Sequence, residues 1–278
     1  MYRPCDAEHG HAIREAVFGL QLAGVHKPAA LQELLAFGQK LWKASLPAIE
    51  QFQLGAPIQA PAALARLRPG VALQVTNGVS FQSFKPDGTL AWRLLVQENL
   101  IAINCLDYNG WENVWPRARE YLSQASNILV SDKNAISGAT LQYINSFNWE
   151  GALEKVDAQS IFRRDAPPVP AGFWDRRSPE WHLHQGWFEE MGKPIVGRIL
   201  HREQLAGRYE QVRGQRVSVV LVDLLNRYDF KVRDSSGQVF FDQHAEPAFH
   251  HMRVLLRRAL RTYLTDVMLE EIGARSLE

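Results

Sequence analysis

Hydrophobic and polar positions alternate along some stretches of this chain and recur at helical spacing along others. Residues 13–22 carry the alternation of a strand. Pro28 then suits the first position of a helix, and apolar residues follow every three or four positions as far as Trp42. Pro47 should end or kink that helix.

A meander of short strands is predicted next. Residues 71–76, 79–84 and 89–97 are strand-like, and Lys85-Pro86-Asp87-Gly88 between the last two has strong turn chemistry. A further strand is predicted at 100–106.

The meander runs into an amphipathic helix. Asn109 is a typical N-cap residue, and Glu112 three positions later completes a capping box. An apolar stripe extends over residues 111–125. Pro116 either lies in the first turn of a helix that begins later or kinks the helix. Residues 139–149 predict the next strand.

The C-terminal part repeats this order of strands and then a helix. Residues 181–191 and 195–205 predict a hairpin around Gly192-Lys193-Pro194. Residues 216–232 predict either one long strand or two strands bent near Asn226, and one long helix at about 246–272 ends the pattern.

Short turns between neighbouring strands favour antiparallel pairing, so the chain is predicted to be α+β, with mostly antiparallel sheets, packed helices and two similar halves. The predicted parts are an N-terminal α+β half at 1–160, a proline-rich crossover at 161–180, and a C-terminal meander plus long helix at 181–278.

Composition and charge set the class of protein. Hydrophobic residues make up 46% and charged residues 22% of the chain, as in soluble globular proteins. The net charge of +1 gives no bulk attraction to nucleic acid or anionic lipid. The first fifteen residues lack the apolar core of a signal peptide, and no apolar run has the roughly 18 residues of a membrane span. We therefore expect a cytoplasmic protein without membrane association.

Two cysteines, Cys5 and Cys105, are too few for a disulfide framework or a metal-binding set, which fits a reducing compartment. The sequence also lacks a phosphate loop, a dinucleotide-binding turn, a nucleophile elbow and a zinc-protease helix. Those enzyme families are excluded, and no cofactor is predicted.

Five short motifs are distributed along nearly the whole chain. They are Glu15-Ala16-Val17-Phe18, Asp87-Gly88, Tyr108-Asn109-Gly110-Trp111-Glu112, Tyr143-Ile144-Asn145 and Thr265-Asp266. In these motifs the chain resembles a sporadically distributed prokaryotic family of uncharacterised proteins, often encoded in mobile or defence-rich genome neighbourhoods. The family pattern has an arginine before Tyr143, where this chain has Gln142. If that arginine carries a function, this chain has lost or moved it.

Three histidines form the candidate metal set. His182 and His184 share a face of their predicted strand, and counting back from the turn places His201 opposite His184. Clustered neutral imidazoles can hold zinc, but structural roles are commoner for histidines at this spacing. No metal is therefore assigned.

Asp223 lies inside an apolar run, where burial would raise the pKa of its carboxyl group unless the group is paired. Such carboxylates are enriched at functional sites. The alternatives are an ion pair with an arginine or a strand bend that lets Asp223 reach water.

Arginines supply the candidate binding residues. Arg253, Arg257 and Arg261 are four residues apart on the last helix, with Arg258 beside them. This row could contact phosphates or acidic groups, or it is a solvated face. In the crossover, the Arg176-Arg177 pair and Trp174 resemble a recognition surface, and the alternative is a linker packed by its aromatic residues.

The sequence thus favours a non-enzymatic binding protein that engages a protein partner. The resemblance implies an immunity, antitoxin or defence-accessory role for it. One alternative is a nucleic-acid-binding component that uses the arginine row of the last helix. Another is a metal-dependent hydrolase or nuclease that uses the three histidines. The identity of the partner and the oligomeric state stay open.

Overall fold

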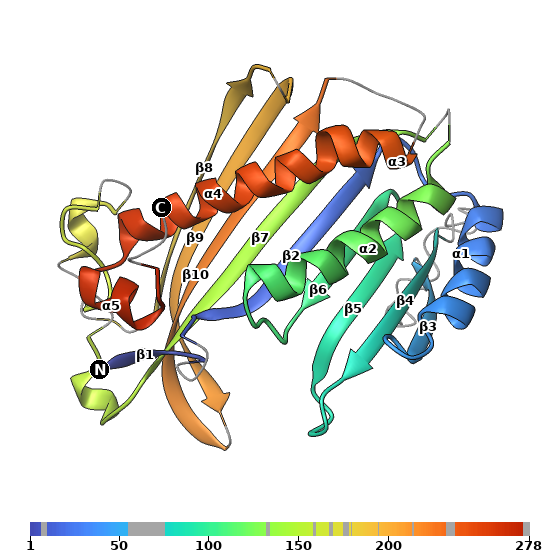
Figure 1. Cartoon of the computed structure of the whole chain (residues 1–278). Helices are drawn as coiled ribbons and strands as arrows, with labels where there is room; N and C mark the ends of the chain where they lie inside the picture. The colour runs from blue at the N-terminus through green and yellow to red at the C-terminus, as the bar shows by residue number, and fades with distance from the viewer. Residues whose placement is uncertain are drawn as a thin grey trace, which may run out of the picture.

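The chain is built on one bent antiparallel sheet with helices along one face (Figure 1). The computed structural model describes residues 1–6, 10–54, 76–131, 134–157, 160–166, 169–174, 178, 180–193, 195–212, 214–231 and 237–274. The strands are β1 Tyr2–Pro4, β2 Ile13–Leu22, β3 Ala48–Leu54, β4 Thr76–Phe84, β5 Leu90–Gln97, β6 Leu100–Cys105, β7 Ile136–Trp149, β8 Trp181–Met191, β9 Gly197–Val212 and β10 Gln215–Phe230. The helices are α1 Pro28–Leu41, α2 Trp111–Leu129, α3 Gly237–Phe240, α4 Glu246–Tyr263 and α5 Asp266–Glu271, with 3-10 turns at Leu153–Lys155 and Ala171–Phe173 and a π-helical turn at Phe241–Ala245.

The strand order is β3-β4-β5-β6-β2-β7-β10-β9-β8, and β1 adds to β7. Each of these pairings is antiparallel. The predicted α+β class with mostly antiparallel pairing is confirmed. Two meanders, β3 to β6 and β8 to β10, flank the central strands β2 and β7. Because β7 pairs with β10 from Gly138 to Asn148, residues from both 1–160 and 181–278 belong to one sheet.

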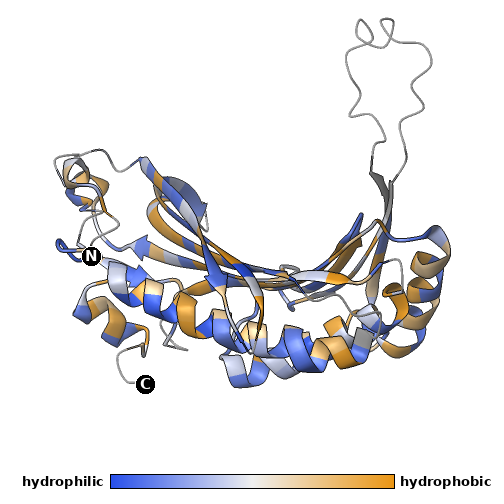
Figure 2. Cartoon of the chain, turned by 90° about the horizontal axis from the view of Figure 1, so that it is seen from above, coloured by the Kyte–Doolittle hydropathy of each residue, from blue (hydrophilic) through white to orange (hydrophobic). Residues whose placement is uncertain are grey.

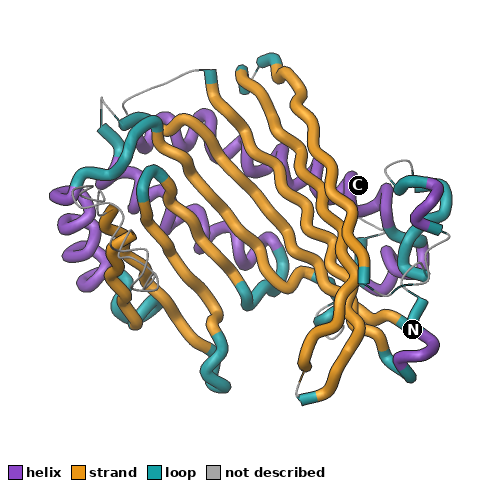
Figure 3. Tube along the Cα trace, turned by 180° about the vertical axis from the view of Figure 1, so that it is seen from behind, coloured by secondary structure: helices purple, strands orange, loops and turns teal. Residues whose placement is uncertain are grey.

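The helices cover a single face of the sheet. The edges of the sheet turn away from α2 and α4 (Figure 2), and the view from behind shows the central strands in front of the helices (Figure 3). The alternation along β10 explains this arrangement. Val220, Val222 and Leu224 are buried, while Leu221 and Asp223 between them are only partly buried on the other face.

Four aromatic side chains join the two long helices to the sheet. The Trp111 and Trp115 rings, one turn apart on α2, stack with centroids 5.1 Å apart. Trp115 contacts Phe249 of α4 at 4.9 Å, and Phe18 of β2 lies 5.8 Å from Trp115. Burying large rings contributes the most packing energy per residue, so this cluster fixes α2 and α4 relative to β2.

The start of the meander differs from its prediction. β3 was not predicted, because the Ala48–Leu54 segment has Pro47 before it and no turn signal that pairs it with a neighbour. It nevertheless pairs with β4 in a regular antiparallel ladder. The predicted strand at 71–76 lies, except for its last residue, outside the described residues.

The predicted single helix at 246–272 is wrong, because it is broken into α4 and α5. Leu264 is extended (φ −85°, ψ 147°), and the Thr265 side chain caps α5 by accepting a hydrogen bond from the Met268 amide. The crossover segment holds the break in place. The Arg163 amide donates to the Tyr263 carbonyl at 2.8 Å, and the Thr265 amide donates to the Ile161 carbonyl at 2.9 Å.

Among the described helices, none is both long enough and apolar enough to cross a membrane.

Gly38 allows α1 to pack closely on β4. A Cβ atom at this position would overlap the Phe81 ring, which is fully buried and packed edge-on against Trp42. We expect Gly38→Ala to lower the free energy of unfolding by about 1 kcal/mol or more, because overpacking costs about 1–3 kcal/mol. The helix propensity gained, roughly 1 kcal/mol, offsets only part of this cost, because the overlap of the Cβ atom with Phe81 Cε1 places the overpacking at the upper end of that range. Urea denaturation checks this, with the exposed Gln39→Ala as the control that should stay near wild type.

His26 should make the protein sensitive to acid. Its side chain is buried, and this burial lowers the pKa of the imidazole. As the pH falls below about 6.5 the unfolded chain takes up the proton first, so the free energy of unfolding declines. We expect His26→Gln to reduce the decline between pH 7.5 and 5.5, measured by urea denaturation at each pH. The exposed His182→Gln should leave it unchanged, and an equal decline in wild type and His26→Gln would contradict the assignment.

Candidate functional site

A pocket of about 360 Å³ lies between α4, the start of α2 and the central strands. Side chains from both Tyr-containing motifs line it, together with two arginines of α4. The lining comprises His11, Ala12, Ile13, Tyr108, Gly110, Trp111, Glu112, Tyr143, Asn145, Leu224, Arg253, Leu256, Arg257, Leu260, Ile272, Gly273 and Ala274. We call it the motif pocket. Its volume is at the small end of the range for ligand pockets, about 300–1,000 Å³.

The chain enters α2 through a glycine that brings the helix close to the pocket. Gly110 is the N-cap residue, with φ at +102°, a conformation that glycine adopts without strain. The predicted capping box is therefore wrong. The Asn113 side chain donates to the Asn109 carbonyl at 2.9 Å, and no side chain caps the helix. Glu112 contacts Arg253 instead.

The helix begins before Pro116, which excludes the alternative of a later start. α2 starts at Trp111 and continues through Pro116. Proline has no N–H to donate to the carbonyl of Glu112, and the helix loses that one bond. The early start places Trp111 in the first turn, where its ring forms part of the pocket wall.

Two guanidinium groups from α4 reach the pocket. The Arg253 guanidinium lies over the Trp111 ring, 4.9 Å from its centroid, and its Nη1 is 3.3 Å from Glu112 Oε1. Arg257 follows one turn later. Its Nη2 atom is buried and has no hydrogen-bond partner among the described residues. Burial, and then the charges of Arg253 and Arg261, lower the pKa of Arg257.

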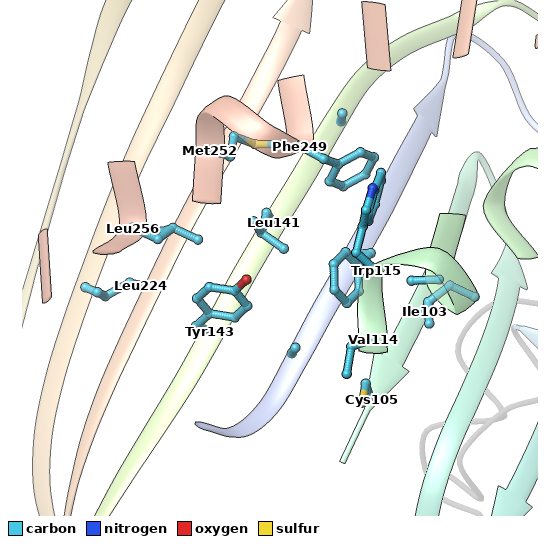
Figure 4. Packing of buried hydrophobic residues seen from close by; sticks show 14 of the residues in the cluster. Ile103, Cys105, Val114, Trp115, Leu141, Tyr143, Leu224, Phe249, Met252 and Leu256 are labelled. Carbon is cyan, nitrogen blue, oxygen red and sulfur yellow. The ribbon is translucent and has the colours of Figure 1, made fainter. Parts of the chain in front are cut away.

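Tyr143 lies on the floor of the pocket. Its side chain is 5% exposed, and in Figure 4 its ring lies between Leu256 of α4 and Val114 of α2. The Tyr143 hydroxyl makes no hydrogen bond of normal distance and angle with a described residue, and the Tyr108 hydroxyl is the side-chain group with which it interacts. Burial, and then the neighbouring Tyr108, raise its pKa well above the usual value. The hydroxyl therefore stays protonated and can donate a hydrogen bond.

The opposite wall of the pocket is built from the motif that contains Tyr108 and from β2. Burial raises the pKa of Tyr108 to about 12, and its ring meets the Tyr143 ring edge-on at 6.0 Å. His11 Nε2 lies 2.8 Å from the Tyr108 carbonyl oxygen, which fixes the loop before α2. Asn145 donates to the Val222 carbonyl at 3.1 Å and so is committed to the sheet.

The predicted arginine row divides into different roles. Arg253 and Arg257 line the motif pocket. Arg261 donates two hydrogen bonds to the Ala274 carbonyl, at 3.0 and 2.8 Å, and so holds the segment after α5 against the pocket. Arg258 is exposed. The four side chains therefore do not form a uniform solvated stripe.

The candidate surface in the crossover is described only in part. Arg176 and Arg177 lie outside the described residues. Trp174 is partly buried and packs edge-on against Phe173 at 5.2 Å, with the Arg164 guanidinium 5.8 Å from its ring centroid.

The three candidate metal ligands do not converge. β8 and β9 pair so that His184 lies opposite Gln204 and His201 lies opposite Trp187, which makes the predicted His184–His201 pairing wrong. His201 is buried and stacks on Trp187 at 4.9 Å, whereas His182 and His184 are exposed. In the described part of the chain, no group of three or more His, Cys, Asp or Glu residues could hold a metal ion.

Asp223 is paired, as one of its predicted alternatives requires. Arg202 Nη2 lies 3.3 Å from Asp223 Oδ2, and Gln142 donates to Asp223 Oδ1 at 2.7 Å. Gln142 of β7 therefore contacts this carboxylate on β10. Arg202 of β9, the strand beside β10, supplies the positive charge. None of the three residues lines the motif pocket.

Comparison of the chain with protein family models, curated proteins and solved structures finds no match. The chemistry of the motif pocket is therefore inferred from its own residues. The sequence singled out Arg253 and Arg257, but it gave no signal that Tyr108 and Tyr143, which are far apart in the chain, share one cavity.

Removing the Tyr143 hydroxyl should stabilise the fold. An unsatisfied buried hydroxyl costs about 1–3 kcal/mol, so we expect Tyr143→Phe to raise the free energy of unfolding by about 1 kcal/mol in urea denaturation. Tyr263→Phe is the matched control. The Tyr263 hydroxyl donates to the buried Glu203 carboxylate, so its loss should destabilise the protein. Destabilisation by both substitutions would show that the Tyr143 hydroxyl is satisfied in the folded protein.

Proposed function

We propose that this chain is a non-enzymatic binding protein and that the motif pocket holds a group of its protein partner. One observation carries the proposal. Tyr143 Oη and Arg257 Nη2 belong to residues of the same cavity, and neither atom makes a hydrogen bond of normal distance and angle with a described residue. Buried polar groups are nearly always hydrogen-bonded, and the exceptions concentrate at functional sites, where another molecule can complete them.

The way the pocket is built supports the same function. Its walls come from β2, the α2 entry, β7, β10, α4 and the segment after α5, so elements from all along the chain position it. Strands and long helices hold a site more rigidly than loops do. A rigid site of this kind suits recognition, because little ordering is needed when the partner binds.

The pocket supports a partner-binding role better than the arginine row supports nucleic-acid binding. Phosphate contacts need solvent-facing cations along one surface. Here Arg253 is paired with Glu112, and Arg261 is bound to the Ala274 carbonyl. In keeping with the resemblance, we propose that the partner belongs to a defence or immunity system.

A tagged purification with a matched pair of variants tests this function. We expect the wild-type chain and Arg258→Gln to recover the same partner from the native host in stoichiometric amounts. Arg257→Gln should lose that partner, because it removes a pocket charge while Arg258→Gln removes an exposed one. A partner retained equally by both variants would place the binding surface elsewhere. A wild-type chain recovered alone would contradict a stable protein partner.

A further inference from the structure

We infer that the motif pocket binds a single carboxylate group carried on an apolar body. The inference rests on the proposed function in one respect, that the motif pocket is the binding site. It adds the chemical class of the bound group, which the charges, donors and walls of the pocket define together.

The charge balance of the pocket favours a group with one negative charge. Of the lining residues, Arg253 is already offset by Glu112, 3.3 Å away. Arg257 contributes a second positive charge, which no described lining carboxylate offsets. One carboxylate neutralises this charge, whereas a phosphate dianion would exceed it. Burial and two neighbouring guanidinium groups disfavour the charge on Arg257, so a bound anion would relieve that cost.

The donors match the shape of a carboxylate. A guanidinium is a planar fork whose N–H groups fit the two oxygens of a carboxylate. Arg257 Nη2 is one buried donor that makes no hydrogen bond of normal distance and angle with a described residue, and the Tyr143 hydroxyl is the other. Because Tyr143 is 5% exposed and stays protonated, it can donate to one carboxylate oxygen while Arg257 donates to the carboxylate as well.

Much of the remaining pocket wall is apolar. Aliphatic side chains from the sheet and the two C-terminal helices form these walls, namely Ile13, Leu224, Leu256, Leu260 and Ile272. The volume of about 360 Å³ leaves room for a ring or a short alkyl chain beside the anionic group. The ligand is therefore amphipathic, with its carboxylate at Arg257 and Tyr143.

Calorimetric titration of the full chain tests the inference with 3-phenylpropionate, the neutral 3-phenylpropanol and inorganic phosphate. Charge-assisted hydrogen bonds are strong enough that the acid should bind at least about tenfold more tightly than the alcohol. Phosphate should bind more weakly than the acid. If the alcohol binds as well as the acid, or if the acid does not bind, the inference is overturned. Tighter binding of phosphate would overturn it too. These three measurements need only the wild-type protein.

Variants then locate the carboxylate. Arg257→Gln should weaken binding of 3-phenylpropionate by about tenfold or more, and Tyr143→Phe by roughly threefold to tenfold. Arg258→Gln, on the exposed side of α4, should stay within about twofold of wild type. Unchanged affinity in both Arg257→Gln and Tyr143→Phe would overturn the assignment of the anionic end.

A comparison of two peptides identifies the source of the carboxylate. A short peptide ending in phenylalanine with a free carboxylate should outbind its C-terminal amide if the group is the chain terminus of a protein partner. If 3-phenylpropionate binds and both peptides fail, the ligand is a free organic acid. The two proposals can fail separately. If 3-phenylpropionate binds but recovery of the partner does not depend on Arg257, this inference holds and the proposed function fails.

Discussion

The stacked Trp111 and Trp115 rings are the interaction on which the site depends. They fill the space between Phe18 of β2 and Phe249 of α4, so both long helices are packed against a single buried cluster. Large aromatic side chains contribute most of the burial energy of a core. Protein interiors are close-packed, so they do not deform gradually. The position of α4 over the sheet is therefore set by the side chains of α2.

The same cluster determines the chemistry of the motif pocket. Trp111 supports the Arg253 guanidinium at 4.9 Å, and one helical turn later Arg257 comes to the cavity above Tyr143. Gly110 makes this possible, because its positive φ lets the chain turn directly from the Tyr108 loop into the helix. The motif at residues 108–112 thus positions the helix, and the motif at residues 143–145 supplies the floor of the pocket beneath the arginines.

The sequence predicted most elements and the α+β class, because period-two alternation and strong turn residues such as Asp87-Gly88 are local signals. It failed where a distant contact decides. α4 ends at Tyr263 because the crossover segment pairs beside it, and the β8–β9 register pairs Met191 with Gly197 rather than closing a two-residue turn at Gly192-Lys193. The arginines of the site were visible as a helical row, but their cavity with Tyr143 depends on tertiary packing that spacing along the chain does not encode.

A crystal structure of the chain soaked with 3-phenylpropionate tests the central claim most directly. The account predicts one carboxylate oxygen within about 3.2 Å of Arg257 Nη2 and one within a similar distance of Tyr143 Oη, with the ring against the aliphatic wall of Leu224 and Leu256. Density for the ring in the opposite orientation, with the carboxylate in solvent, would contradict it. So would a pocket in which Arg257 has turned away from Tyr143.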